Sequence, residues 1–180
     1  FSHKLFRGQE VPRQGYRERR TTGQEVTKEE FITQVKAEQN ALRGFLLALC
    51  CGNKEDADDV LQDSLVKAYL ALGHYSDSGR FHSWIFRIAF NTFLNHRACA
   101  RPHAALEEAG HLGFSADNFE HQPLYLALAA LPPRERSAVT LYYLNGYSIK
   151  EIAGISDCSI DAVKKQLSRG REKLKESIKP

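Results

Sequence analysis

The 180-residue sequence contains no methionine, one tryptophan and only four cysteines, and none of the cysteines form a CxxC pair. This spacing excludes the usual zinc-finger frameworks, and we expect the cysteines to act as small buried hydrophobic residues in a reducing compartment. Because no methionine is present, we expect the native chain to start at a residue other than Phe1.

Long apolar runs and catalytic motifs are also missing. There is no stretch of about 18 apolar residues and no apolar segment behind a basic start, so we expect a cytoplasmic protein without membrane insertion. No nucleophile elbow, glycine-rich phosphate loop or HExxH pattern occurs, and we therefore expect neither an enzyme nor a cofactor. The net charge of +3 is small, so any binding of nucleic acid must depend on where the charges lie.

Two segments near the N-terminus have the apolar period of an α-helix. Thr27 and Glu30 have the spacing of a capping box, and the apolar stripe that follows ends near Cys51 and Gly52. The segment 53–72 predicts a second helix. Its apolar stripe consists of Ala57, Leu61, Leu65, Ala68 and Leu72.

The second helix carries its acidic residues on a separate stripe. Such a face is usually only solvated, but it could also be a docking surface for a partner protein. The residues on this stripe are Asp56, Asp59, Gln62 and Asp63.

The segment 79–101 predicts a helix with two different faces, since a helix has about 3.6 residues per turn. The apolar face consists of Ile85, Phe86, Ala89 and Phe93. The opposite face consists of Trp84, Arg87, Asn91 and Asn95. These side chains can stack on bases, neutralise phosphates and hydrogen-bond base edges, although a packed tryptophan with solvated amides is the alternative interpretation.

The chain divides into four parts by composition. Residues 1–23 are basic and lack apolar periodicity, which predicts a flexible extension or a remnant of recombinant expression. Residues 24–100 predict a small helical domain, 101–119 a flexible linker and 120–180 a second helical domain. His96, Cys99 and His103 have helical spacing for metal ligands, but Pro102 and the lack of a fourth ligand speak against a metal site.

The C-terminal domain predicts a helix-turn-helix. Ser148 and Glu151 have the spacing of a capping box on a short helix, a turn follows at 156–158, and Ser159 caps a long final helix. We expect this helix to bury Ile160, Val163, Leu167, Gly170 and Leu174. We expect its exposed face to present Lys164, Lys165, Ser168 and Arg169, which can bind phosphates and base edges.

Three motifs resemble those of the extracytoplasmic-function sigma factors of the sigma-70 family. Together with the segments between them, they cover about four fifths of the chain. EDADDVLQDSLVKAYLAL resembles the region 2.2 helix that docks on RNA polymerase, and FHSWIFRIAFNTFLNHRA resembles regions 2.3 and 2.4, which melt and read the minus-10 element. LPPRERSAVTLYYLNGYSIKEIAGISDCSIDAVKKQLSRGREKLK resembles region 4, which binds the minus-35 element.

The resemblance implies an all-α fold of two helical domains and partners that are bacterial RNA polymerase core, promoter DNA and an anti-sigma factor. Asp56, Asp59, Gln62 and Asp63 would contact the core enzyme. The residues implied for the minus-10 element are His74, Arg80, Phe81, Ser83, Trp84, Arg87, Asn91 and Asn95. Those implied for the minus-35 element are Ser159, Lys164, Lys165, Ser168 and Arg169. Asp161 and Ala162 stand where the family commonly has Gly-Thr, so a hydroxyl suited to a phosphate is lost.

Two other classes of protein fit parts of the sequence. A stand-alone transcriptional regulator of the response-regulator output type would use the helix-turn-helix alone and bind duplex DNA without polymerase. A protein-interaction module would use its acidic and basic faces only to assemble complexes and would show no promoter preference.

Overall fold

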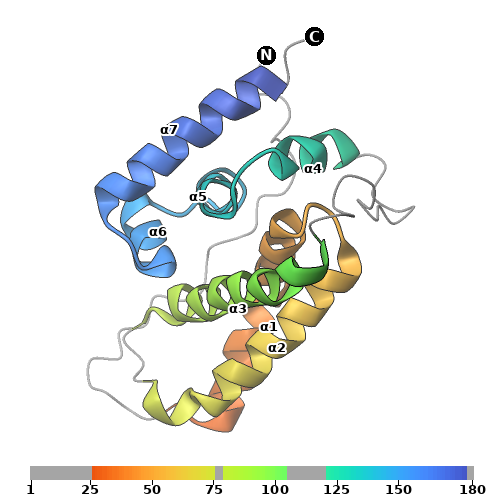
Figure 1. Ribbon diagram of the computed structural model, residues 1–180. Helices are drawn as coiled ribbons and strands as arrows, with labels where there is room; N and C mark the ends of the chain where they lie inside the picture. Colours follow the sequence, from red (N-terminus) through yellow and green to blue (C-terminus); the bar gives the residue numbers. More distant parts are fainter. Residues whose placement is uncertain (1–25, 76–78, 105–120, 178–180) are drawn as a thin grey trace.

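The computed structural model describes residues 26–75, 79–104 and 121–177, and every regular element within these residues is a helix (Figure 1). The N-terminal module contains α1 (Lys28–Leu49), α2 (Lys54–Leu70), the 3-10 helix η1 (Leu72–His74) and α3 (Phe81–Ala104). The C-terminal module contains α4 (Gln122–Ala129), α5 (Pro133–Tyr143), α6 (Ile149–Ser156) and α7 (Ile160–Ser177). The all-α prediction is confirmed.

The starts of α1 and α2 are fixed by side-chain caps. The Thr27 hydroxyl accepts a hydrogen bond from the Glu30 amide at 3.2 Å, and the Glu30 carboxylate accepts one from the Thr27 amide at 3.1 Å. The Asn53 side-chain oxygen accepts from the Asp56 amide at 3.2 Å. These contacts satisfy amides that have no partner inside the helix, so both predicted helix starts are confirmed.

The turn between α1 and α2 requires a glycine at position 52. Gly52 has a φ of 86°, and a Cβ placed on it would lie 2.7 Å from the ring of Tyr125 in α4. A larger residue there would strain the backbone and displace the tyrosine ring. The turn therefore joins α1 to α2 and also lets α4 approach closely.

Helices α1, α2 and α3 pack around one aromatic and aliphatic core. The predicted inward face of α3 is confirmed, because Ile85, Phe86 and Ala89 have no exposed surface and Phe93 is 3% exposed. Helix α3 ends later than the sequence predicted. It continues through Pro102 to Ala104, because a proline in a final turn removes one hydrogen bond without preventing a few further helical residues. The linker predicted at 101–119 therefore begins after Ala104 and not at residue 101. The rest of the predicted linker lies outside the described residues.

In the C-terminal module, α7 packs on α5 through a close contact at Gly170. A Cβ at Gly170 would lie 2.7 Å from Cγ2 of Val139. The capping box at Ser148 and the Ser159 cap are present, so the two helices of the helix-turn-helix begin as predicted. The prediction that Ile160 is buried is wrong, since its side chain lies in the first turn of α7 and is 45% exposed.

The two modules pack directly against each other. Figure 1 shows α6 lying beside α3 and α5 lying above α1, and both pairs are in contact. Buried residues from both modules form one hydrophobic cluster. The two predicted helical domains are therefore present, and they share an interface that the sequence did not predict.

Candidate nucleic-acid interface

The acidic stripe of α2 faces solvent. The side chains of Asp56, Asp59, Gln62 and Asp63 are all exposed. Asp63 also reaches the neighbouring helix α3, where its Oδ2 lies 2.7 Å from Nε2 of His96. Asp59 lies near the middle of this stripe on α2 and is available to a partner protein.

Asp58, in the same acidic segment, has a structural role. Its two carboxylate oxygens accept hydrogen bonds from Nε and Nη2 of Arg43 in α1, at 2.8 and 2.9 Å. The hydrogen bond from Arg43 lowers the pKa of the Asp58 carboxyl below its ordinary value. This bidentate pair links α1 to α2, as the contact of Asp63 with His96 links α2 to α3.

The polar face of α3 is exposed over its middle turns. Arg87, Asn91 and Asn95 are exposed, opposite the buried face of the helix. Trp84 is half-buried and stacks on Tyr75, with ring centroids 4.3 Å apart and an interplanar angle of 29°. One face of the tryptophan ring is therefore covered by Tyr75, while the amides and the guanidinium remain at the surface.

Phe81 does not lie on this exposed surface, although the sequence grouped it with the residues expected at the minus-10 element. Its ring is 6% exposed and packs edge-on against Phe31 and Tyr75. Phe81 lies four residues before Ile85 and eight before Ala89, so the helical period places it on the buried face of α3. Of the other residues predicted around the α2–α3 loop, His74 and Arg80 are exposed and Ser83 is half-buried, while residues 76–78 lie outside the described residues.

Residues of α6 and its flanking turns contact α3 beside this face. Nη2 of Arg87 lies 2.8 Å from Oδ1 of Asp157. The ring of Tyr147 stacks on His82 and meets the ring of Phe86 edge-on. Sequence analysis missed Tyr147 and Asp157 as interface residues. Tyr147 directly precedes the Ser148 cap, a position at which apolar residues commonly pack, so its burial had a local signal.

The basic face of α7 is open. Lys164, Lys165, Ser168 and Arg169 are exposed. Nζ of Lys164 lies 3.4 Å from Oδ1 of Asp161, and the Ser168 hydroxyl donates to Glu172 at 3.3 Å, so these contacts stay within α7. The helix begins at Ser159, whose hydroxyl accepts a hydrogen bond from the Ala162 amide at 3.1 Å. A capped helix with cations along its first exposed turns can enter a DNA groove.

Comparison with known families places both modules. Residues 34–102 match the model for sigma-70 region 2, and residues 121–174 match the model for sigma-70 region 4. The ECF RNA polymerase sigma-E factor of Salmonella typhimurium is 31% identical over 147 residues, which cover 69% of this chain and 75% of the relative. The chain belongs to the ECF sigma factors of the sigma-70 family. The region 2 match distinguishes this sigma factor from a stand-alone helix-turn-helix regulator.

Further relatives extend over most of the chain. The ECF sigma-E factor of Haemophilus influenzae is 27% identical over 177 residues, covering 87% of this chain and 92% of the relative. The sigma factor RpoE of Bartonella quintana, solved with the anti-sigma factor NepR, superimposes with a TM-score of 0.70 at 26% identity, covering 83% of this chain and 97% of RpoE. CnrH, solved with the cytosolic domain of CnrY, gives a TM-score of 0.66 at 26% identity, covering 83% and 88%.

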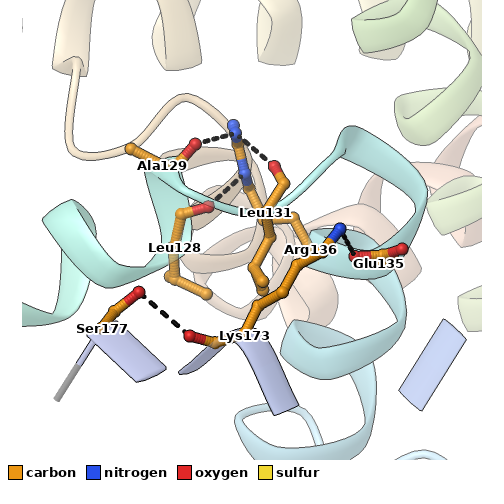
Figure 2. A network of polar contacts seen from close by, with 7 residues as sticks. All are labelled: Leu128, Ala129, Leu131, Glu135, Arg136, Lys173 and Ser177. Atoms are coloured by element: carbon orange, nitrogen blue, oxygen red, sulfur yellow. Dashed lines mark hydrogen bonds and ion pairs between the residues drawn. The ribbon is translucent and has the colours of Figure 1, made fainter. Parts of the chain in front are cut away.

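A buried arginine stabilises the corner of this sigma factor where α1, α4 and α5 meet. Arg136 is 3% exposed and donates to the main-chain carbonyls of Leu128, Ala129 and Leu131, as Figure 2 shows. Its Nη1 also donates to the carbonyl of Leu49, at the end of α1. Burial lowers the pKa of the guanidinium, but four carbonyl acceptors replace its hydration. Periodicity does not predict a buried arginine, so sequence analysis missed this residue.

The cysteines provide no reactive site among the described residues. Burial raises the pKa of the Cys50 thiol to about 12, so this thiol stays protonated at neutral pH. No group of three or more His, Cys, Asp or Glu side chains within the described ranges could hold a metal ion. None of the described helices is long and apolar enough to cross a membrane.

Proposed function

We propose that this ECF sigma factor uses three surfaces in transcription initiation. The acidic stripe of α2 docks on bacterial RNA polymerase core, the exposed face of α3 binds the melted minus-10 strand, and the exposed face of α7 reads the minus-35 element. The sigma factor thus contributes binding and no catalysis, and it acts in the cytoplasm on the polymerase. An anti-sigma factor is a further partner, because the similar RpoE was solved with one.

The two-sided character of α3 is the observation that carries this proposal. Asn91 and Asn95 are exposed one turn apart, while Phe90 and Phe93 on the other side of the helix are buried. Amide groups on a solvent face can hydrogen-bond the edges of bases, and the neighbouring Trp84 can add stacking if a base reaches the ring face that Tyr75 does not cover. Unpaired bases expose these edges and faces, whereas a stacked duplex exposes only its groove edges.

The test replaces the two exposed amides. Asn91→Ala with Asn95→Ala should leave the fold and core binding intact but reduce promoter opening, by about 1–3 kcal/mol if both amides contact bases. Permanganate reactivity of unpaired thymines, measured with holoenzyme on duplex and pre-melted promoters, reports this step. Asn40→Ala, an exposed asparagine in α1, is the matched control. If the double variant opens duplex promoters as well as the parent does, α3 is not the minus-10 surface.

The docking surface is tested separately. Asp59→Lys reverses the charge of an exposed side chain on α2 and should weaken co-purification with polymerase core without changing the thermal melt. Glu176→Lys makes the same charge change on an exposed residue of α7 and should leave core binding unchanged. Equal core binding by both variants and the parent would remove the docking assignment.

A further inference from the structure

A carboxylate lies among the cations at the start of α7. Asp161 is in the first turn of this helix, and its side chain is 82% exposed. Its Oδ1 lies 3.4 Å from Nζ of Lys164. Lys164 and Lys165 follow Asp161 by three and four residues, so the three side chains share one face of the helix. Asp161 therefore belongs to the same surface as the residues proposed to read the minus-35 element.

A negative charge on this surface is unfavourable for most contacts with DNA. The phosphates are negative, so a carboxylate that faces them weakens binding to every sequence. The neighbouring ammonium of Lys164 is itself 60% exposed, and ion pairs between exposed side chains are weak. The carboxylate therefore keeps its charge and its acceptor capacity when α7 approaches a duplex, and it favours binding where it meets a hydrogen-bond donor.

The bases differ in the donors that they present to the major groove. Guanine presents two acceptors, and thymine presents one acceptor and a methyl group. Adenine presents an amino group next to the acceptor N7, whereas cytosine presents its N4 amino group and no acceptor of its own. A carboxylate at the groove floor consequently favours cytosine and disfavours the other three bases.

The first turn of α7 is well placed for such a contact. The Ser159 hydroxyl accepts a hydrogen bond from the Ala162 amide at 3.1 Å, which fixes the backbone on both sides of Asp161. The buried side chains of Val163 and Leu167 anchor the opposite face of the helix. In a helix-turn-helix, the N-terminal residues of the second helix contact base edges. The short aspartate side chain thus extends from a fixed point at the end of the helix that would enter the groove.

We propose that Asp161 is a specificity-determining residue of the minus-35 surface and accepts a hydrogen bond from the N4 amino group of a cytosine in the major groove. The proposal rests on the proposed function for the role of α7. The same carboxylate opposes binding of other sequences, because it then faces base acceptors or phosphates without a donor. Asp161 thereby gives selectivity at the expense of affinity for unmatched duplexes.

The test measures base preference with the assembled holoenzyme. Selection from a random-sequence duplex pool, followed by sequencing of the bound fraction, identifies the minus-35 element of the parent. Synthetic duplexes then replace one G·C pair of this element at a time by each other base pair. Their affinities are measured for holoenzymes with the parent, Asp161→Ala, Asp161→Asn and the control Glu176→Gln. Glu176 is exposed near the other end of α7, and its variant also loses one negative charge.

We expect the parent to lose about fivefold or more in affinity when the contacted G·C pair is replaced. Asp161→Ala should lose discrimination at this pair alone and should bind the replaced duplexes more tightly than the parent does. Asp161→Asn should change the preferred base there from cytosine to adenine, because asparagine forms paired hydrogen bonds with N6 and N7 of adenine. Glu176→Gln should keep the base preferences of the parent.

A base preference is a ratio of affinities within one preparation, so partial unfolding of a variant does not change it. If Asp161→Ala and Asp161→Asn keep the preferences of the parent at every position, the proposal is wrong. The carboxylate would then act through its charge alone, on the phosphates or on the start of the helix.

Failure of the proposed function gives a different result. In that case Lys165→Ala and Arg169→Ala would leave promoter affinity and its salt dependence unchanged. If these two variants weaken binding while the Asp161 variants keep the base preferences of the parent, α7 contacts the minus-35 element and the assignment of Asp161 alone is wrong.

Discussion

The proposed minus-10 and minus-35 surfaces carry similar polar side chains but have different surroundings. On α7, Lys165 and Arg169 are exposed, and the neighbouring Lys164 pairs only with Asp161 of the same helix. On α3, Arg87 pairs with Asp157 of the other module. The α7 surface is therefore open, whereas the α3 surface is partly covered by the C-terminal module, to which α7 belongs.

This difference shows that exposure of a single helix face does not determine whether the face is available. The residues of α3 alone predict a solvent-facing arginine, and Arg87 is indeed exposed. Its availability depends on a residue 70 positions later in the chain, which can be seen only after α6 has been placed on α3. The two proposed DNA-binding surfaces thus share a contact, because Arg87 of one pairs with Asp157 of the module that carries the other.

Removal of the buried Arg136 guanidinium should destabilise the protein more than any other change considered for these surfaces. Arg136→Met fills a similar volume but leaves the carbonyls of Leu49, Leu128, Ala129 and Leu131 without their donor. We expect a loss of roughly 3 kcal/mol or more in the free energy of unfolding, because hydrogen bonds from a charged group are strong and the acceptors are buried. Urea unfolding followed by circular dichroism measures this change.

Arg134→Met is the matched control, because Arg134 is exposed in the same helix α5. It should change the unfolding free energy by no more than about 0.5 kcal/mol. Equal stability of the two methionine variants would contradict the structural role given to Arg136.

A second prediction concerns the open surface alone. Lys165→Ala and Arg169→Ala should each weaken binding of promoter duplex by about 1–3 kcal/mol where the side chain reads a base, and should reduce the salt slope where it meets a phosphate. Holoenzyme binding to promoter DNA at several salt concentrations separates the two cases. An unchanged affinity and slope for both variants would place the minus-35 contact elsewhere.

The third prediction tests how α7 is positioned. Gly170→Ala brings a Cβ to 2.7 Å from Cγ2 of Val139, so we expect overpacking to cost about 1–3 kcal/mol of stability. Gly154→Ala, in α6, meets no atom within 4 Å and should be neutral or stabilise the protein by up to about 1 kcal/mol. Thermal melts of both alanine variants measure the difference. Identical shifts in melting temperature for Gly170→Ala and Gly154→Ala would show that α5 and α7 can move apart without loss of stability.

Local signals predicted most of the helices, and long-range contacts explain what they missed. Capping boxes at Thr27 and Ser148 and the apolar period of α3 depend on residues three or four apart, so the sequence contains them directly. Asp157 was missed because its partner Arg87 comes from the other module. Arg136 was missed because its partners are main-chain carbonyls, three in its own module and one, that of Leu49, in the other. Phe81 lies four residues before Ile85, so the period of α3 already indicates its burial, whereas Ile160, in the first turn of α7, is exposed against the period. The docking and DNA-contact residues stay predictions.

The smallest expected effect concerns the start of α6, where the covered surface begins. Glu151 is partly buried, which by itself would raise its pKa, but hydrogen bonds from the Ser148 hydroxyl and amide, with a contribution from His82, hold the pKa of its carboxyl below the ordinary value. A carboxyl with a lowered pKa in the folded state stabilises the protein at neutral pH. This stabilisation is present above the pKa of the unfolded chain, about 4. It is lost as the pH falls from there through the lowered pKa of the folded state, because the carboxyl is then protonated in both states.

Ser148→Ala removes the cap and should cost about 1 kcal/mol at neutral pH. Glu151→Gln retains a side chain that can complete the capping box but cannot ionise, so its deficit relative to the parent should be present at neutral pH and shrink below about pH 4. Glu55→Gln, an exposed acid in the first turn of α2, is the control and should show a smaller dependence on pH. Urea unfolding at both pH values measures all three variants. If the loss of unfolding free energy in Glu151→Gln stays constant with pH, the ionised carboxylate does not stabilise the start of α6. The contact between α6 and α3 would then depend on the Arg87–Asp157 pair and on the ring contacts of Tyr147.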